Sequence, residues 1–194
     1  MHALDMHLKT KERLRIIVLE GEFIRGDAEK FVEFVKKNKP IDEVLFSSPG
    51  GFLYEGLSLG RRMREFGFLA RIPNGATCAS ACAWAFLGGQ LRIVDSGGRY
   101  GDHMATMISN DQLVSKFKSI LERASSEESD TVLRLIMALT EKAAAQAAAT
   151  KAEYLVKMGV SLRLLAPGVN TDAWDMYWFS AQELRAYNVT NIER

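Results

Sequence analysis

Ser80 stands in a run of small residues that is typical of an exposed nucleophile. The run 77–89 places its hydroxyl where an extended segment turns into a tightly packed helix. A sharp turn of this kind exposes the serine oxygen and aims backbone N–H groups at a developing oxyanion. The chemistry would be attack of the hydroxyl on an acyl group. Without its neighbours, Ser80 would be interpreted as a small residue at a helix start.

Two other features could take part in the same chemistry. Gly50 and Gly51 form a turn upstream of the serine, and His103 lies downstream as the only histidine after the first ten residues. A neutral imidazole can remove the serine proton during attack, and glycine lets a backbone N–H point into a cleft. Together these residues predict acyl transfer. The alternative for His103 is a hydrogen-bonded histidine of the core.

Cys78 and Cys82 flank the serine and are the only cysteines of the chain. We interpret them as small apolar residues of a buried helix, because free cysteine is often buried. A disulfide would need an oxidising compartment, and the i,i+4 spacing on a regular helix suits it poorly. Zinc is not expected, because two cysteines without nearby histidines cannot complete a tetrahedral site.

The elements that must position these residues alternate between strand and helix. Strands are predicted at 14–19, 44–46, 69–73, 91–94 and 100–104, with helices at 27–39, at 53–66 and after Ser80. Repeated β-α units imply a parallel sheet with right-handed crossovers. The functional residues of such sheets lie beyond the carboxyl ends of the strands. The glycine turn and the Ser80 turn both follow strands, so we expect them to share one cleft.

Length and composition predict a single α/β domain over residues 1–194. With 47% hydrophobic and 25% charged residues the chain is of the globular class. Residues 1–13 are expected to be flexible and 110–165 to form a helical insertion. A net charge of +1 without long charged runs gives no indication of nucleic-acid binding. No apolar stretch reaches the roughly 20 residues of a membrane span, and none resembles a signal peptide, which favours the cytoplasm.

Three motifs in this order resemble a known family. Segments 47–51, 78–81 and 101–103 are similar to the Clp protease proteolytic subunit. They are closer to bacterial ClpP-like proteins, often exported, that carry a Cys-x-Ser-Ala-Cys motif. The resemblance implies a ClpP/crotonase-type spiral of β-β-α units with a mainly helical C-terminal region. It also implies a serine peptidase that acts on a peptide or protein substrate without a cofactor, and it allows a periplasmic location.

The resemblance also implies roles for individual residues. Ser80 falls on the family's nucleophile and His103 on its general base. Gly51 and Ala81 fall on the two backbone donors of the oxyanion hole.

The acid of the triad rests on the segment 171–184. Spacing to Ser180 puts Asp172 in the place of the family's aspartate, with Asp175 as the fallback and Asp102 as a competitor. Asp172 could equally be a surface acid in a loop.

One region departs from the family pattern. Between His103 and Asp172 the chain is longer than in the protease subunit, where this region is the handle that joins two rings, so ring stacking does not carry over. Its helices offer more apolar surface than a small sheet covers, which predicts a homo-oligomer. The residues concerned are Ala143–Ala149, Val132, Leu135, Ile136 and Leu139.

Two alternatives to a serine hydrolase remain open. One is a non-catalytic ClpP-like binding or assembly module. The other is a crotonase-like acyl-CoA enzyme, in which two N–H donors hold a thioester oxygen. That class does not need a serine–histidine pair, so the presence of Ser80 with His103 argues against it.

Overall fold

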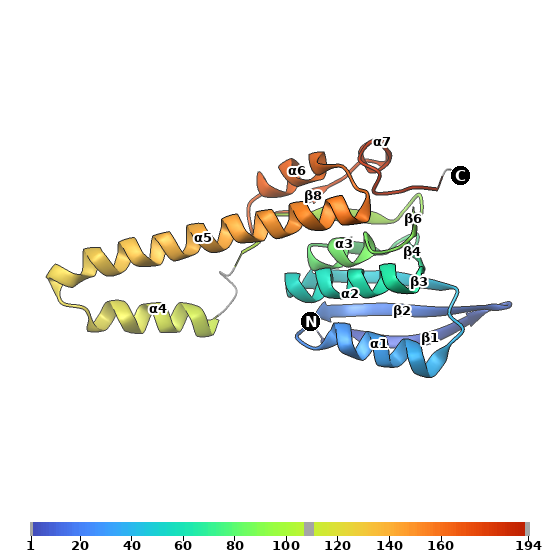
Figure 1. Cartoon of the computed structure of the whole chain (residues 1–194), viewed down its shortest axis with the longest axis horizontal. Helices are drawn as coiled ribbons and strands as arrows, with labels where there is room; N and C mark the ends of the chain where they lie inside the picture. Colours follow the sequence, from blue (N-terminus) through green and yellow to red (C-terminus); the bar gives the residue numbers. More distant parts are fainter. Residues whose placement is uncertain (1, 107–110, 193–194) are drawn as a thin grey trace.

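Mainly parallel strands form the body of the molecule (Figure 1). The structure is a computed structural model that describes residues 2–106 and 111–192. The strands of the described part are β1 (Asp5–Lys11), β2 (Leu14–Phe23), β3 (Glu43–Gly51), β4 (Leu69–Ile72), β5 (Thr77–Ala79), β6 (Leu91–Val94), β7 (Arg99–Asp102) and β8 (Tyr177–Trp178). They join in one sheet of order β1-β2-β3-β5-β7-β8, from which β4 and β6 branch at β3.

The sheet branches because β3 is long enough to pair with two successive strands. Its first residues pair with β4, whereas Ser48 pairs with Cys78 of β5. β5 in turn pairs with β7, with Ala79 opposite Gly101. These pairings are parallel, and the two outermost strands, β1 and β8, are antiparallel to their neighbours. The carboxyl ends of β3, β5 and β7 therefore lie side by side.

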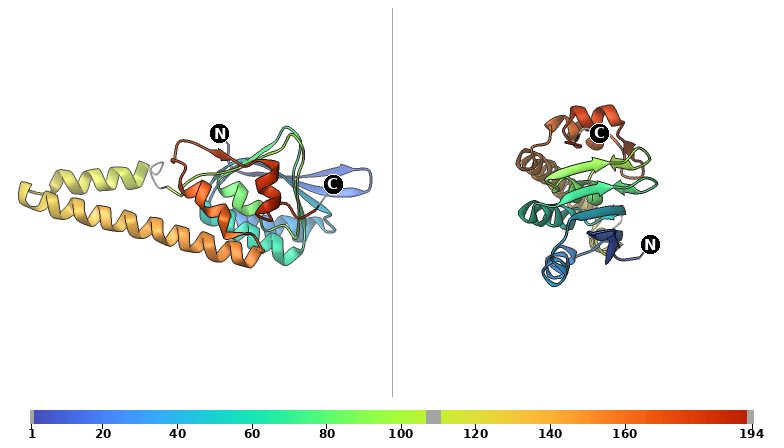
Figure 2. Two further views of the ribbon diagram at one scale, coloured as in Figure 1. Left: turned by 90° about the horizontal axis from the view of Figure 1, so that it is seen from above. Right: turned by 90° about the vertical axis from the view of Figure 1, so that its right-hand side faces the viewer.

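The chain has helices along one side of the strands, and further helices in the body and in a projecting part (Figure 2). They are α1 (Asp27–Asn38), α2 (Leu53–Phe66), α3 (Ala81–Phe86), α4 (Asp111–Arg123), α5 (Ser126–Met158), the 3-10 turn η1 (Leu162–Leu164), α6 (Leu165–Val169) and α7 (Ala181–Ala186). Helices α1, α2 and the C-terminal half of α5 are those that lie along one side of the strands. Leu57, Leu59 and Met63 of α2 are fully buried, as their spacing predicts. All six residues of α3 are buried, so this helix lies inside the body.

A row of aromatic rings fills the core beneath the strand ends. Phe46 of β3 meets Phe86 of α3 edge-on, with ring centroids 5.9 Å apart. Phe86 meets Tyr100 of β7 at 5.9 Å, and Tyr100 meets Phe179 at 5.6 Å. Edge-to-face pairs of this kind are favourable beyond the area that they bury. The row connects β3 with β7 through α3.

The α/β class and the mainly helical C-terminal region are confirmed. Residues 5–11, within the segment expected to be flexible, form β1, and every residue of β1 pairs with one of β2. Leu4, Met6 and Leu8 alternate along this segment and pack on the core. This period of two is typical of a half-buried strand.

α4 and residues 126–142 of α5 form a helical arm that projects from the body (Figure 1). No residue of α4 is buried. At 33 residues, α5 is about 50 Å long at the usual rise of an α-helix. None of the helices in the described ranges has an apolar stretch sufficient to span a membrane.

Two arginines hold the carboxyl end of α3. The guanidinium of Arg64 donates to the carbonyls of Leu87 and Gly89, each at 3.2 Å. Arg92, which is 1% exposed, donates to Gly89 at 2.9 Å. Burial lowers the pKa of Arg92 to about 10. Because this value is still well above neutral pH, the guanidinium remains charged. Cations are favourable at this end of a helix, where the last carbonyls lack partners within the helix.

Arg92 also fastens the C-terminal segment, because it donates to the carbonyls of Asn188 and Val189, each at 2.8 Å. Arg92→Met is expected to lower the free energy of unfolding by about 3 kcal/mol, because several buried carbonyls lose their donor. Urea unfolding followed by circular dichroism measures this. Arg62→Met, at an exposed arginine of α2, is the matched control and should change it by less than about 0.5 kcal/mol. Equal midpoints for the two variants would contradict the assigned role.

Candidate active site

Ser80 occupies a strained turn between β5 and α3. Its backbone has φ 54° and ψ −123°, a conformation that a residue with a side chain rarely adopts. Holding it costs on the order of 1–3 kcal/mol. The Ser80 N–H donates to the Gly101 carbonyl at 3.0 Å, and the Ser80 carbonyl accepts from Trp84 at 3.3 Å. The sharp strand-to-helix turn predicted at Ser80 is therefore present, and the residue is partly exposed.

Gly50 lies directly against this turn. A Cβ built on Gly50 would lie 2.7 Å from the Ser80 Cβ and 3.1 Å from the Ala81 nitrogen, so no larger residue fits. Gly51, the predicted oxyanion donor, instead faces β2, where a Cβ would meet Phe23. The first glycine of the pair is thus the one packed against the serine turn. The role of the Gly51 N–H as an oxyanion donor stays a prediction.

His103 follows β7, the strand next to the one that ends at Ser80. The pairing of Ala79 with Gly101 places both residues at the carboxyl ends of neighbouring parallel strands. Burial lowers the pKa of His103, Lys151 adds to this effect and Asp102 opposes it. The imidazole is therefore neutral at pH 7, as a general base must be.

Among the described residues, no hydrogen bond joins the imidazole to Ser80 or to a carboxylate. Its Nδ1 is buried and lacks a partner within the described residues. The described hydrogen bonds likewise include none between the Ser80 hydroxyl and His103. Such bonds are often long in the absence of substrate and tighten in the complex.

The predicted acids lie in a loop near His103 without bonding to it. Thr171 accepts from the Met104 N–H at 3.1 Å, which brings the segment with Asp172 beside the residue that follows the histidine. Both Asp172 and Asp175 are exposed, and Asp175 accepts from the backbone of its own loop. Their roles in the triad stay predictions.

A buried ion pair beneath the site escaped sequence reasoning. Asp102 is 2% exposed and Lys151 of α5 is 3% exposed, with Lys151 Nζ 3.1 Å from Asp102 Oδ2. The Asp102 carboxylate also accepts from Trp84 Nε1 at 3.0 Å. The partners are 49 residues apart, so no local pattern joins them. The one available signal was a lysine directly after the uncharged stretch 143–150.

Cys78 and Cys82 form a disulfide across the serine turn, with their Cα atoms 5.1 Å apart. The interpretation as free cysteines is therefore corrected. It assumed one regular helix, whereas Cys78 lies in β5 and Cys82 in α3. The bond spans the turn between them and closes a small ring that contains Ser80. Both residues are fully buried.

The structure brings Ser80, the 50–51 turn and His103 to neighbouring strand ends. A partly exposed serine at a strained turn, a neutral imidazole on the next strand end and backbone N–H groups are the parts that acyl transfer needs. Among the described residues, no group of three or more His, Cys, Asp and Glu could hold a metal ion.

Comparison with protein-family models and with curated proteins finds no match. Among solved structures, a mutant of the 1510-N membrane-bound stomatin-specific protease is similar to this chain. The TM-score is 0.49 at 13% sequence identity, and the match covers 89% of this chain and 75% of that protein.

The disulfide gives a prediction for the stability of the fold. Cys78→Ala with Cys82→Ala is expected to lower the free energy of unfolding by about 2 kcal/mol, the loop-closure value for a ring this short. Thermal or urea unfolding of the oxidised protein and the double variant measures the difference. Thiol alkylation of the denatured wild type, with mass spectrometry, provides the control. Two alkylated cysteines before reduction would show that the bond is absent.

Proposed function

We propose that this chain is a serine hydrolase, and specifically a peptidase, with Ser80 as nucleophile and His103 as general base. The observation that carries the proposal is the strained backbone of Ser80 at the end of a strand, next to the strand end that carries His103. A residue held in such a conformation points to function, because strain persists where the surroundings impose it.

The proposed reaction runs through an acyl-enzyme. Ser80 Oγ attacks the carbonyl carbon of a peptide bond while its proton passes to the His103 imidazole. The carbonyl oxygen becomes an oxyanion, for which the backbone N–H groups at Ala81 and in the 50–51 turn are the candidate donors. The tetrahedral species collapses, and His103 gives its proton to the departing amine. Water, activated by the same imidazole, then releases the acid and restores the serine.

A non-catalytic binding module is the second candidate. The observation that favours it is that His103 Nδ1 has no hydrogen-bond partner within residues 2–106 and 111–192, because a triad needs an acid at that nitrogen. In the proposed hydrolase, Asp172 supplies the acid at Nδ1, because its loop already contacts Met104. In the competing proposal the same turn serves to bind a peptide without cleaving it.

The disulfide bears on the compartment. Disulfides form and persist in oxidising compartments and are rare in the cytosol of mesophiles. Of the cytoplasmic and periplasmic locations considered from sequence, the Cys78–Cys82 bond favours the periplasmic one. The proposed site would then act on peptides outside the cytoplasm.

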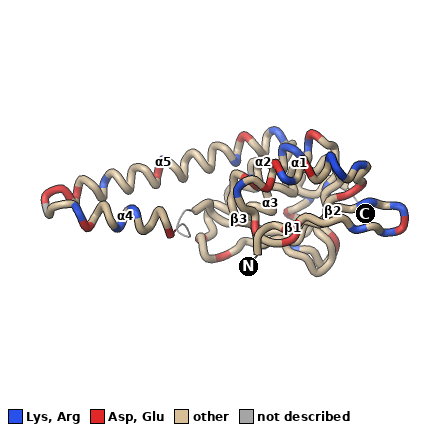
Figure 3. Tube along the Cα trace, turned by 90° about the horizontal axis from the view of Figure 1, so that it is seen from below, with Lys and Arg blue, Asp and Glu red and all other residues tan. Residues whose placement is uncertain are grey.

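The arm supports a proposed homo-oligomer. Leu135 and Leu139 of α5 are each 58% exposed and Met137 is 59% exposed. Between Leu135 and Thr140 the helix carries no charged residue (Figure 3). A helix that is apolar all round is normally buried.

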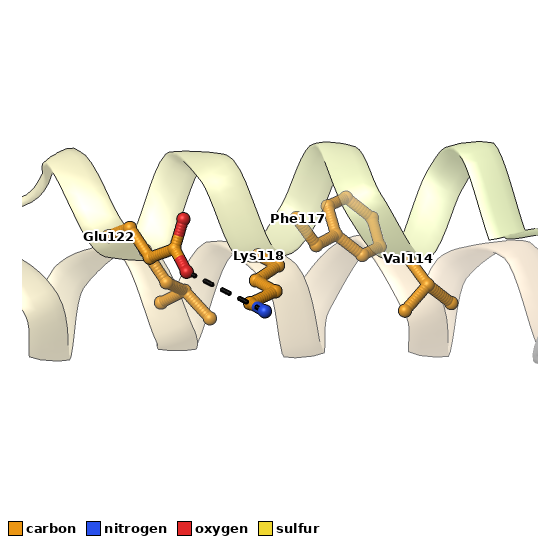
Figure 4. A pocket seen from close by; sticks show the side chains of 5 residues that line it. Val114, Phe117, Lys118 and Glu122 are labelled. Atoms are coloured by element: carbon orange, nitrogen blue, oxygen red, sulfur yellow. Dashed lines mark ion pairs between the residues drawn. The ribbon is translucent and has the colours of Figure 1, made fainter.

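α4 covers only one side of this part of α5. Its own Val114, Phe117 and Leu121 line an open apolar hollow on α4, beside the Lys118–Glu122 ion pair (Figure 4). We therefore assign the remaining apolar surface to a second copy of the chain.

A fluorophosphonate probe tests the proposed nucleophile. It should bond to Ser80 of the wild type, because the activated hydroxyl attacks phosphorus as it would attack an acyl carbon. Ser80→Ala should abolish labelling, and His103→Gln should slow it by about 10²-fold or more. Peptide mapping by mass spectrometry identifies the labelled residue. Thermal unfolding of the variants shows whether the fold is kept.

Ser129→Ala, at a serine of the arm, is the matched control and should label like the wild type. Labelling that persists in Ser80→Ala would remove Ser80 from the proposal. A folded wild type that binds peptides but never reacts with the probe would favour the binding module.

Light scattering tests the oligomer. The wild type is expected to exceed the monomer mass of 21.6 kDa at micromolar concentration. Leu135→Glu with Leu139→Glu should give the monomer, because two carboxylates would have to be desolvated in the interface. Substituting exposed Lys142 by Glu provides the control for added negative charge. A monomeric wild type would refute the assignment.

A further inference from the structure

Lys151 is buried at the point where α5 passes beneath the strand ends. Its ammonium, 3% exposed, lies 3.1 Å from one Asp102 oxygen and 3.4 Å from the other. The same nitrogen lies 4.6 Å from the centroid of the Trp84 ring. Burying a lysine is costly unless its charge is paired, so the contact with Asp102 is the one that stabilises it.

Asp102 is enclosed on every side by packed elements. Trp84 of α3 donates to Oδ1, and Lys151 of α5 binds both oxygens. On the α6 side Gly168 approaches so closely that a Cβ there would be 2.5 Å from Oδ2. The carboxylate is thus held in place and has no room to turn toward a substrate.

This ion pair contacts the backbone of His103 directly and is linked to the backbone of Ser80 through Trp84. Asp102 directly precedes His103, and Lys151 Nζ lies 3.3 Å from the His103 carbonyl oxygen. Trp84, the indole donor to Asp102, also bonds through its backbone N–H to the Ser80 carbonyl. One buried cluster therefore connects α5 with the chain at the histidine and at the serine.

We infer that Lys151 is a positioning residue for His103. The Lys151 ammonium holds the His103 main chain and cancels the Asp102 charge beside the imidazole. The catalytic role of Lys151 rests on the proposed hydrolase. Its electrostatic effect on the His103 imidazole does not, because the imidazole titrates whether or not the protein catalyses a reaction.

The charges around the ring are few. Asp102 of β7 favours the imidazolium and Lys151 of α5 opposes it. α3 and α6 contribute no charged side chain, and the nearby loop contributes the exposed Asp172 and Asp175. Removing the ammonium leaves the Asp102 charge unopposed, and an unopposed carboxylate at this range raises a histidine pKa.

NMR titration of the imidazoles tests the inference without any substrate, since His2 and His7 are the only other histidines. Lys151→Met is expected to raise the His103 pKa by about one pH unit or more. Lys151→Gln should do the same, and its amide still gives Asp102 a donor. Because Lys151→Met leaves a bare carboxylate in the core, the inference is judged on the Gln variant if the Met variant fails to fold.

Two further variants separate charge from packing. Lys151→Met combined with Asp102→Asn removes both charges and should return the His103 pKa close to the wild-type value. Lys157→Met, at an exposed lysine of the same helix, should leave it unchanged. A folded Lys151→Gln protein with the wild-type His103 pKa would overturn the inference and leave Lys151 a purely structural role.

Labelling kinetics then distinguish this inference from the proposed function. If the wild type reacts with a fluorophosphonate, the rate should fall on the acid side at the His103 pKa measured by NMR in each variant. If the wild type does not react, the proposed function fails while the titration still decides the role of Lys151. Labelling whose pH dependence is identical in wild type and Lys151→Gln would count against the inference.

Discussion

The register of three short parallel strands is the constraint on which the candidate site depends. Ser48 pairs with Cys78 and Ala79 with Gly101, so the chain leaves β3, β5 and β7 at one edge. A shift of one residue would turn each side chain to the opposite face of the sheet. Because the pairing segments are short, the register is held by what packs against them. The aromatic row below and the buried α3 supply that packing.

Much of the body could be predicted from sequence because local signals were strong. α2 spans Leu53–Phe66, the range that its apolar spacing predicts. The strand-to-helix turn at Ser80 was also visible in the run of small residues. β1 was missed because the many polar and charged residues of this segment were interpreted as a flexible terminus, although Leu4, Met6 and Leu8 alternate with them.

The site was less predictable because it depends on contacts between distant residues. The Asp102–Lys151 pair joins a strand end to the C-terminal part of a long helix. No periodicity of the sequence predicts that contact. The disulfide was misjudged because the boundary between β5 and α3 falls between its cysteines. For Asp172, spacing identified a segment beside Met104, but the orientation of a loop carboxylate is not set by spacing.

α3 is short, yet both of its ends are fixed. The disulfide closes the turn before it, and Arg64 and Arg92 hold the carbonyls after it. Short helices usually fray and exchange their amide hydrogens through local openings. With no free end, α3 has few such openings. Its amides, including that of Ala81, should exchange with solvent mainly when the whole domain unfolds. The proposed nucleophile would thus sit in the most slowly exchanging part of the molecule, while the arm exchanges fastest.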